Sequence, residues 1–369
     1  MPDFGDIRSD QVGSLLRPVR LLEARTSYNQ GSVSRDDLRL VEDEAVLQAL
    51  EMQDQAGMDV VTDGEYRREA FMSELAEAVD GFAPPEESAP MRWFGPGETS
   101  TPTRVRVVNG HLTPKRRLTA HETSFLREHA TKPFKVTMPS PTFIAQGAFR
   151  VGVTDRFYPT PDDLTWDLTR VLKAEIAATV GDGVTYIQLD APHYTRYCDL
   201  QQREEMRSRG IDPDEAMERA MAADNDCLGA TQGRGVIGAV HICRGNSRSR
   251  WRSDGGYDPV AEVLFSTLNP DRFLLEYDTE RAGGFEPLRF IPRGKLVVLG
   301  LVTTKTGDLE DRDTLLRRIE EAAKYIPLED LAISPQCGFA SERDGNLLTW
   351  DDQRRKLELV AETARAVWG

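Results

Sequence analysis

Apolar, often β-branched residues gather in eight short runs along the chain, and each run ends in polar or small residues. The runs are, in order, QVGSLL near residue 11, MDVVTDGE near 58, FKVTMPSP near 134, VTYIQLDAP near 184, VIGAVHICRG near 236, RFLLEYDTE near 272, KLVVLGLVTTK near 295 and LAISPQCGF near 331. A strand that helices cover on both faces has such a near-continuous apolar sequence. The pattern therefore predicts eight parallel strands.

Helical spacing of apolar residues fills most of the gaps between these runs. It predicts helices over residues 36–56, 161–180, 311–325 and 350–368. Ser34 is placed to cap the first of these helices and Gly57 to end it. The second begins at Pro161 and stops before Gly181, which is the usual asymmetry of helix ends.

Strands that alternate with helices predict an α/β fold, a (β/α)8 TIM barrel, with residues 1–369 as a single domain. The alternative is a doubly wound sheet, which favours a glycine-rich phosphate turn after the first strand. Gly13, Ser14 and Leu15 do not form such a turn. Residues 73–131, rich in Pro, Gly and charge, interrupt the alternation after the second strand. We expect an insertion there, with a β-hairpin over the barrel mouth, the face at which the strands end.

The composition restricts the classes of function. A chain of 369 residues with 39% hydrophobic and 29% charged residues fits a soluble barrel with a sizeable core. Its net charge of −15 argues against general binding of nucleic acids or anionic membranes, which requires clustered positive charge. The start MPDFGDIRSD lacks the apolar core of a secretory leader, and no apolar run approaches the ~18 residues of a membrane span. We therefore expect a cytoplasmic protein with reduced thiols; its oligomeric state is left open, a homo-oligomer included.

Four residues with metal-binding side chains lie at the ends of predicted strands: His241 and Cys243 in one run, then Glu276, then Cys337. Parallel strands of a barrel end at one face, so these residues can converge there. The spacing of His241 and Cys243 puts both side chains on the same side of an extended segment. The alternative is that the cysteines are small buried residues and His241 a hydrogen-bonded core histidine. A glutamate is costly to bury without a partner, which favours a Zn²⁺ site made of all four.

This ligand set indicates the chemistry of the metal. Structural zinc sites usually have paired Cys-x2-Cys knuckles, and the chain has none. Two thiolates and one carboxylate bring three negative charges to a 2+ ion, which makes the metal a poor activator of water. Such a zinc is suited to hold a third thiolate, from a substrate, and to keep it deprotonated near neutral pH. The residues therefore favour thiol alkylation over hydrolysis.

The motifs HICRGN, LLEYDTERAG, GLVTTKTG and ISPQCGF, with GMDVVTDGEYRREAF and YIQLDAPH upstream, resemble the catalytic barrel of cobalamin-independent methionine synthases. The resemblance runs over nearly the whole chain. It implies a methyltransferase, similar to 5-methyltetrahydropteroyltriglutamate–homocysteine methyltransferases, that transfers a methyl group to the thiol of homocysteine and so serves methionine biosynthesis. It also implies Zn²⁺ as the cofactor, held by His241, Cys243, Glu276 and Cys337.

The resemblance also carries over substrate-binding positions. Gly13 and Ser14 resemble a Gly-Ser turn that contacts homocysteine through its backbone. Glu65 and Asp190 match two carboxylates that bind the ammonium group of the amino acid. The alternatives are a surface ion pair of Glu65 with a neighbouring arginine, and a helix cap or barrel-mouth acceptor for Asp190.

The chain departs from the full-length enzymes in two ways. Those enzymes have two barrels, whereas this chain has the length of one and resembles single-barrel relatives. Its methyl donor is therefore open between a folate, a corrinoid protein and a small metabolite. The family's histidine after the seventh strand, thought to act as an acid, is replaced by the segment LGLVTTKTG. Lys305 in that segment and His193 after the fourth strand are the candidate catalytic proton sources, although His193 could also be a solvent-facing or supporting residue.

Two other functions use the same residues. Epoxyalkane:coenzyme M transferases are similar in sequence and in zinc–thiolate chemistry, and there the small-molecule thiol is coenzyme M and the electrophile is an epoxide. The arginines of the loop after Cys243 could clamp a sulfonate, or they could simply be solvated charges; they are Arg244, Arg248, Arg250 and Arg252. The third hypothesis, beside methyl transfer and epoxide opening, is a non-catalytic barrel with a structural zinc. A metal-free decarboxylase that acts on a tetrapyrrole is disfavoured by the ligand set.

Overall fold

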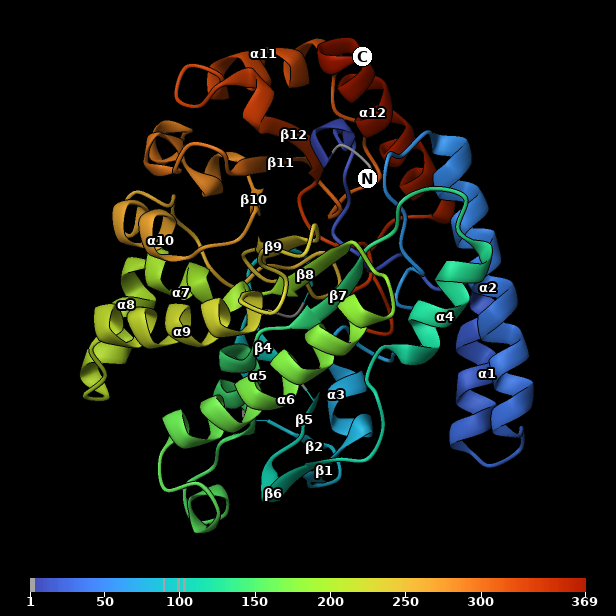
Figure 1. Ribbon diagram of the computed structural model, residues 1–369, viewed down its shortest axis with the longest axis vertical. Coiled ribbons are helices and arrows are strands. Elements are labelled where there is room, and N and C mark those ends of the chain that lie inside the picture. The colour runs from blue at the N-terminus through green and yellow to red at the C-terminus, as the bar shows by residue number, and fades with distance from the viewer. Residues whose placement is uncertain (1–3, 89, 98–99, 102–103) are drawn as a thin grey trace.

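The computed structural model describes residues 4–88, 90–97, 100–101 and 104–369. Six parallel strands form one sheet in the order β12-β11-β10-β9-β8-β7 (Figure 1). They are β7 Val136–Pro139, β8 Tyr186–Asp190, β9 Ile237–Ile242, β10 Arg272–Glu276, β11 Leu296–Val302 and β12 Leu331–Pro335. Nearly all of their residues are buried, as their continuous apolar sequences predict.

Two further segments complete the predicted barrel through shorter contacts. Ser9 forms a parallel bridge with Ile333 of β12, and Val61 forms one with Phe134 beside β7. The amide of Asp59 donates to the carbonyl of Ser9 at 3.3 Å, so the two segments also meet each other. The α/β fold is thus confirmed, and these bridges extend both edges of the six-stranded sheet in the way that a barrel requires. The first strand was placed wrongly, because the pairing occurs at Ser9 and the run QVGSLL continues from it as a loop into the barrel mouth.

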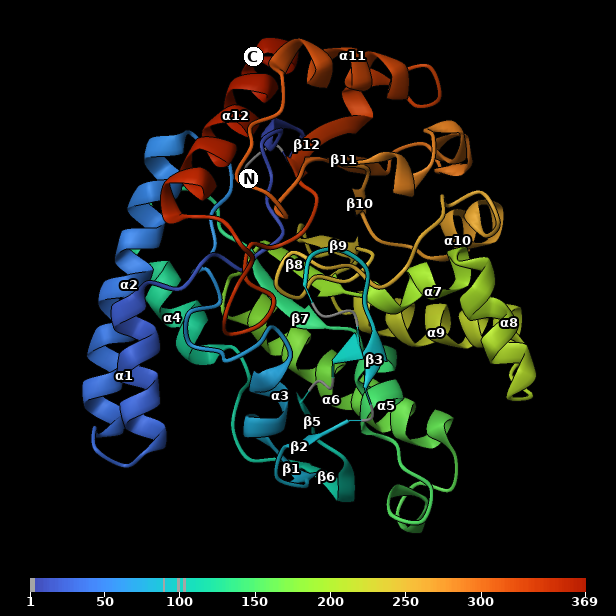
Figure 2. The same cartoon turned by 180° about the vertical axis from the view of Figure 1, so that it is seen from behind.

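Helices surround the sheet on the outside (Figures 1 and 2). They are α1 Val19–Asn29, α2 Arg35–Ala56, α3 Ser73–Ala78, α4 Ala120–His129, α5 Pro141–Ala148, α6 Pro161–Gly181, α7 Thr195–Cys198, α8 Leu200–Ser208, α9 Pro213–Leu228, α10 Ala261–Thr267, α11 Arg312–Ala322 and α12 Trp350–Trp368. The four predicted helices are α2, α6, α11 and α12. Ser34 caps α2 in a capping box with Asp37, and Gly57 ends it with φ 85°. Helix α1 escapes prediction because it starts after Pro18 without a side-chain cap.

The segment over residues 73–131 contains short antiparallel pairs (Figure 2). These are β1 Val79–Phe82 with β6 Val108–Pro114, β2 Glu86–Glu87 with β5 Arg104–Val105, and β3 Met91–Arg92 with β4 Ser100–Thr101. Beyond β3, Phe94 bridges Trp251 in the loop that follows β9, so the segment touches the barrel mouth. Residues 89, 98–99 and 102–103 lie outside the described residues. That the segment is an insertion in one catalytic domain stays a prediction.

A buried ion pair lies inside the barrel. Lys135 Nζ donates to Asp10 Oδ1 and to Gln188 Oε1, both at 2.7 Å. Gln188 Nε2 in turn donates to Asp190 Oδ1 at 2.8 Å. Because each buried charge has a hydrogen-bonded partner, the pair is tolerated in the interior, and the network fixes the orientation of Asp190 at the end of β8.

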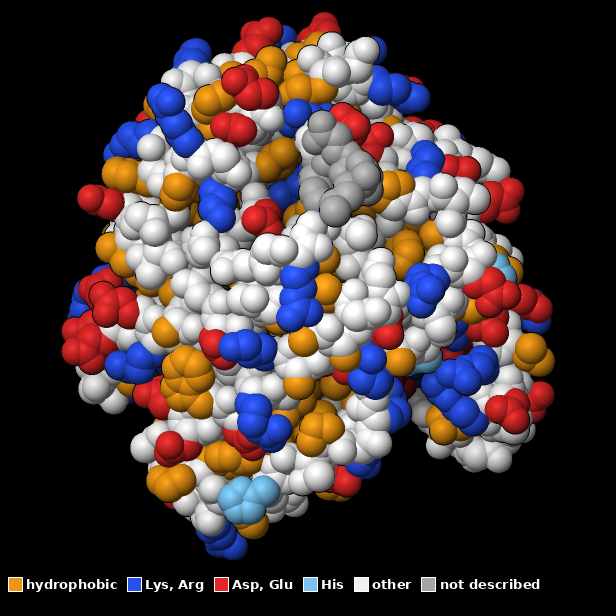
Figure 3. All heavy atoms as spheres, in the orientation of Figure 1, with side chains coloured by type: hydrophobic (Ala, Val, Ile, Leu, Met, Phe, Trp, Pro, Cys, Tyr) orange, Lys and Arg blue, Asp and Glu red, His pale blue; other side chains and the backbone are white. Residues whose placement is uncertain are grey.

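Basic and acidic side chains are interspersed on the face of the surface that Figure 3 shows. Among the described residues, none belongs to a helix that is both long and apolar enough to cross a lipid bilayer.

Candidate metal centre

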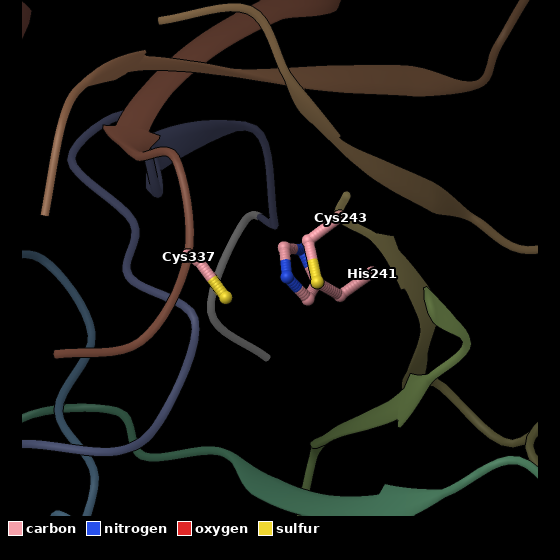
Figure 4. Close-up of side chains that lie close together, drawn as sticks. All are labelled: His241, Cys243 and Cys337. Atoms are coloured by element: carbon pink, nitrogen blue, oxygen red, sulfur yellow. The ribbon is translucent and has the colours of Figure 1, made fainter. Parts of the chain in front are cut away.

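His241, Cys243 and Cys337 converge at the barrel mouth (Figure 4). His241 lies in β9, Cys243 directly follows that strand, and Cys337 follows β12 on the other side of the mouth. One donor atom of each residue lies within 4.8 Å of the others, and the three side chains are buried. The His-x-Cys spacing therefore places both side chains on one side of the strand, as the sequence predicts.

The two cysteines affect each other's acidity. Cys243, followed by His241, lowers the pKa of Cys337 well below the ordinary value of a thiol, although burial opposes this. Cys337, together with burial, raises the pKa of Cys243 well above its ordinary value. A metal bound here would be held by both sulfur atoms as thiolates, because metal binding displaces their protons.

These residues fit a zinc ion. Neither ring nitrogen of His241 has a hydrogen-bond partner in the described part of the protein, although the ring is buried. A buried imidazole without a partner is unusual, and a metal ligand is one of the few roles that explain it. Two sulfur donors and one imidazole are a donor set that favours zinc over hard cations.

Glu276, the predicted fourth ligand, lies beside the cluster but is not a member of it. Its Oε1 accepts hydrogen bonds from Nε and Nη2 of Arg281 at 3.0 and 2.8 Å. Its Oε2 accepts from the backbone amide of Arg244 at 2.9 Å. Burial would raise the pKa of Glu276, but the charges of Arg281 and Arg244 lower it below its ordinary value. The carboxylate is therefore ionised and held by an arginine that the sequence interpretation did not include.

The predicted substrate residues Gly13 and Glu65 are in contact. A Cβ on Gly13, whose φ is +154°, would lie 2.9 Å from Glu65 Oε1 and 2.9 Å from Thr137 Cγ2. Glu65 Oε1 accepts a hydrogen bond from Thr137 Oγ1 at 2.8 Å, whereas its Oε2 has no partner among the described residues. Burial raises the pKa of Glu65, and the charge of Arg68 opposes this. Arg68 Nη1 lies 3.8 Å from Glu65 Oε1, and both side chains are buried. The structure thus contradicts the alternative of an ion pair at the surface.

Ser14 and Asp190 lie on either side of the cluster. The carbonyl of Ser14 accepts from the amide of Phe339 at 2.8 Å, which brings Ser14 next to the loop that carries Cys337. Asp190 pairs with His241 in the register of β8 and β9. Burial raises the pKa of Asp190 to about 7; His241 opposes the rise and the negative charge of Glu65 adds to it. A carboxylate whose pKa is raised by burial and by a second carboxylate is suited to receive a cation.

The two candidate proton sources differ. His193 is buried, neither of its ring nitrogens has a hydrogen-bond partner within the described residues, and burial followed by the charge of Arg196 lowers its pKa to about 3. It is therefore neutral at pH 7, which does not favour it as an acid. Lys305 Nζ donates to Asn246 Oδ1 at 3.1 Å, and its positive charge contributes to the lowered pKa of Cys337. Lys305 is thus close enough to Cys337 for its charge to act on that thiol.

The four arginines of the loop after β9 do not form a common clamp. Arg244 is buried and donates to the backbone carbonyls of Gly255 and Glu276, so its role is to hold the loop. Arg248 is exposed and pairs with Asp344 at 3.2 Å. Arg250 lies over the ring of Trp93, with the guanidinium carbon 5.4 Å from the ring centroid. Arg252 has no carboxylate within ion-pair distance among the described residues.

Sequence reasoning missed the residues that support Glu65. Arg68 donates to both oxygens of Glu122, at 2.7 and 2.6 Å, and to Thr137 Oγ1 at 3.1 Å. The guanidinium of Arg17 binds backbone carbonyls on both sides of the mouth, including those of Arg68 and Ala340. No spacing in the sequence reveals these contacts, because the partners come from distant segments.

Comparison with known proteins identifies the family. Residues 9–365 match the family model for the catalytic domain of cobalamin-independent synthase. The uncharacterised protein YxjH of Bacillus subtilis is 38% identical over 371 residues, which cover 98% of this chain and 94% of that protein. A methionine synthase of Saccharolobus solfataricus is 26% identical over 89% of this chain and 86% of its own length.

Solved structures have the same fold. A proposed vitamin-B12-independent methionine synthase of Listeria monocytogenes superimposes with a TM-score of 0.76 and 30% identity, over 98% of both chains. A B12-independent methionine synthase of Shewanella sp. W3-18-1 gives a TM-score of 0.75 at 23% identity, over 98% of this chain and 97% of that chain. Because the family model spans nearly the whole chain and the fold agrees, this protein belongs to the family of cobalamin-independent methionine synthase catalytic domains.

Proposed function

We propose that this enzyme is a zinc-dependent thiol alkyltransferase that methylates the thiol of homocysteine and so forms methionine. The observation that supports this most is the cluster of His241, Cys243 and Cys337, whose donor set suits zinc and lies next to two buried carboxylates. Zinc bound there would lower the pKa of a substrate thiol so that the thiolate predominates near neutral pH. Reduced cysteines of this kind suit the cytoplasm.

Glu65 and Asp190 are proposed to bind the ammonium group of homocysteine. Both carboxylates are buried and both have raised pKa values, Asp190 because of burial and then because Glu65 adds negative charge. An ammonium between them would stabilise the ionised forms of both. Gly13 allows Glu65 to approach, since any side chain at that position would meet Glu65 Oε1.

The same two carboxylates favour homocysteine over coenzyme M. A sulfonate placed near Glu65 and Asp190 would meet like charge in a buried site. Repulsion that raises the pKa of one carboxylate by one unit costs about 1.4 kcal/mol. Epoxide opening by coenzyme M would need the sulfonate to lie elsewhere in the mouth. We therefore propose the amino-acid thiol as the acceptor.

Lys305 is the proposed proton source for the leaving group. Its ammonium donates to acceptors of the loop after β9 and its charge reaches Cys337. His193 is proposed only as a neutral hydrogen-bond donor, because its pKa of about 3, set by burial and Arg196, keeps it uncharged.

The test measures proton release when homocysteine binds to the zinc-loaded protein. Calorimetric titrations in two buffers of different ionisation enthalpy give the number of protons released. We expect homocysteine to release about one proton more per chain than homoserine, which carries the same ammonium but lacks the thiol. Coenzyme M is the comparison for the alternative function. Tighter binding and equal proton release with coenzyme M, undiminished in Glu65→Gln, would replace homocysteine by a sulfonate thiol.

A further inference from the structure

We propose that Arg196 and Arg252 form an anion-binding subsite that receives an anionic group, a carboxylate, sulfonate or phosphate, of the alkyl donor. The inference rests on the proposed function, since it assigns the subsite to the second substrate of the same reaction. Its evidence is separate from the metal centre and comes from two partly buried arginines to which the fold gives no acidic partner within ion-pair distance among the described residues.

Neither arginine is neutralised by the protein. An ion pair requires a carboxylate oxygen within 4.0 Å, and neither Arg196 nor Arg252 has one among the described residues. Arg196 donates from Nη1 to the amide oxygen of Gln146 at 2.8 Å, and its buried Nε has no partner in the described part of the chain. The chain has 61 acidic and only 46 basic residues, so charge partners are not scarce. Two partly buried cations without an acid need a reason.

The charge of Arg196 acts on Arg252. Burial lowers the pKa of each, and the charge of Arg196 contributes to the lowering at Arg252. The acidic residue whose charge reaches both is Glu205, which is exposed on α8 and is not within ion-pair distance of either. An anion between the two arginines would relieve their repulsion and could accept several charge-assisted hydrogen bonds from the planar guanidinium groups.

The backbone places both arginines next to the metal centre. Arg252 lies in the loop after β9. Its backbone amide donates to the carbonyl of Arg244, the residue after Cys243, at 2.7 Å. Arg196 lies on α7 beside Thr195, whose Oγ1 donates to the carbonyl of Cys243 at 2.9 Å. Both side chains therefore start from main chain that is hydrogen-bonded to the residues around Cys243. A donor anchored there would be held beside the thiol acceptor.

His193 adds a second, independent indication. Its ring is 1% exposed, and neither nitrogen has a hydrogen-bond partner among the described residues, although a neutral imidazole offers one N–H donor. Arg196 is the charged group that acts on this ring. A polar ligand at Arg196 is therefore the partner that would satisfy His193.

The test titrates the purified full chain with inorganic sulfate by calorimetry at constant ionic strength. We expect saturable binding of about one sulfate per chain in the wild type, weakened roughly tenfold or more in Arg196→Gln and in Arg252→Gln, as loss of a charge-assisted hydrogen bond implies. Arg248→Gln is the matched control, because Arg248 lies on the same loop as Arg252 but is exposed and paired with Asp344. We expect Arg248→Gln to bind sulfate as tightly as the wild type does.

Three results would overturn the subsite. They are no saturable sulfate binding in the wild type, equal binding in all four proteins, and loss of binding in Arg248→Gln alone. Zinc content and proton release with homocysteine are measured on the same variants. If both are normal while sulfate binding fails to depend on the arginines, only the subsite is wrong. If Arg252→Gln instead weakens homocysteine itself, the anionic group belongs to the acceptor and the assignment to the donor is wrong.

Discussion

Arg281 holds Glu276 beside the metal cluster through two hydrogen bonds to one carboxylate oxygen, from Nε at 3.0 Å and from Nη2 at 2.8 Å. The ring of Trp251 lies 5.0 Å from the guanidinium carbon of Arg281, and Phe94 stacks on Trp251 with ring centroids 6.3 Å apart. A continuous set of contacts thus leads from the hairpin segment to the carboxylate that the sequence predicts as a zinc ligand. Arg281 and a zinc ion bound to the cluster would compete for this carboxylate.

Replacing Arg281 should therefore strengthen metal binding. In Arg281→Met we expect zinc affinity to rise about tenfold, because one charge-assisted interaction of roughly 1.5–3 kcal/mol no longer holds Glu276 away. The metal-free protein should at the same time lose stability, since the change leaves a buried carboxylate unpaired. Competition with a chromophoric chelator measures the affinity. Arg289→Met is the control, because Arg289 is exposed and donates to the carbonyl of Glu286 in its own turn. Weaker zinc binding in Arg281→Met would mean that Arg281 supports the ligand.

The contact of Gly13 with Glu65 predicts a selective defect. In Gly13→Ala the new methyl group would lie 2.9 Å from Glu65 Oε1, so Glu65 must move. We expect homocysteine binding to weaken about tenfold or more while zinc content stays unchanged, which corresponds to at least ~1.4 kcal/mol. Gly31→Ala is the control, because Gly31 also has a positive φ but has nothing within 4 Å of the added atom. Loss of zinc in Gly13→Ala, or an equal binding defect in the control, would contradict this account.

Glu65 should discriminate by charge. In the wild type we expect homocysteine to bind more tightly than 4-mercaptobutyrate, which keeps the thiol and the carboxylate but lacks the ammonium. Glu65→Gln should lose most of this preference, by about 1.5–3 kcal/mol, as expected for a hydrogen bond to a charged group. Calorimetric titration of both thiols gives the difference. A preference that survives in Glu65→Gln would show that the ammonium lies elsewhere.

Asp224 predicts the pH dependence of stability. It is fully buried, and burial raises its pKa to about 7, although hydrogen bonds from Ser140 and Tyr194 oppose the rise. Between about pH 4 and pH 7 the unfolded chain loses this proton while the folded chain keeps it, so folding is progressively disfavoured as pH rises and the cost is complete above pH 7. Asp224→Asn removes this titration.

We therefore expect Asp224→Asn to gain about 2–3 kcal/mol relative to the wild type between pH 5 and pH 8. An asparagine can still accept from one hydroxyl and donate to the other, so the site remains satisfied. Urea unfolding at both pH values measures the change. A difference between variant and wild type that is the same at pH 5 and pH 8 would show that Asp224 is ionised in the folded protein.

The core of the site could be predicted from sequence because it depends on strand ends. His241 lies near the end of one strand and Cys243 directly follows it, whereas Cys337 follows another strand of the same parallel sheet, so the apolar runs alone bring the three to one face. The position of Glu276 could not be predicted in the same way. Arg281 returns to it through a short turn that carries no periodic pattern, and the competition between the two partners is visible only in three dimensions.

Packing between distant segments also escapes prediction. The first strand was misplaced because its pairing is a single bridge at Ser9, with too little regular structure to leave a pattern. The docking of Phe94 on Trp251 joins the hairpin segment to a loop far along the chain. The proposed anion binding by Arg196 and Arg252 depends on their lack of an acidic partner among the described residues. A sequence pattern cannot predict this, because it does not show which side chains lie within ion-pair distance of each other.

The most direct test of the account is the zinc content of the purified protein, wild type beside Cys337→Ser and Cys227→Ser, measured by elemental mass spectrometry. Cys227 is the matched control because it is also a buried cysteine but lies in α9 and its Sγ contacts the carbonyl of Thr169. The account predicts about one zinc per chain in the wild type and in Cys227→Ser, and loss of zinc in Cys337→Ser. Zinc that is retained in Cys337→Ser, or protein purified without chelators that contains no zinc, would contradict it.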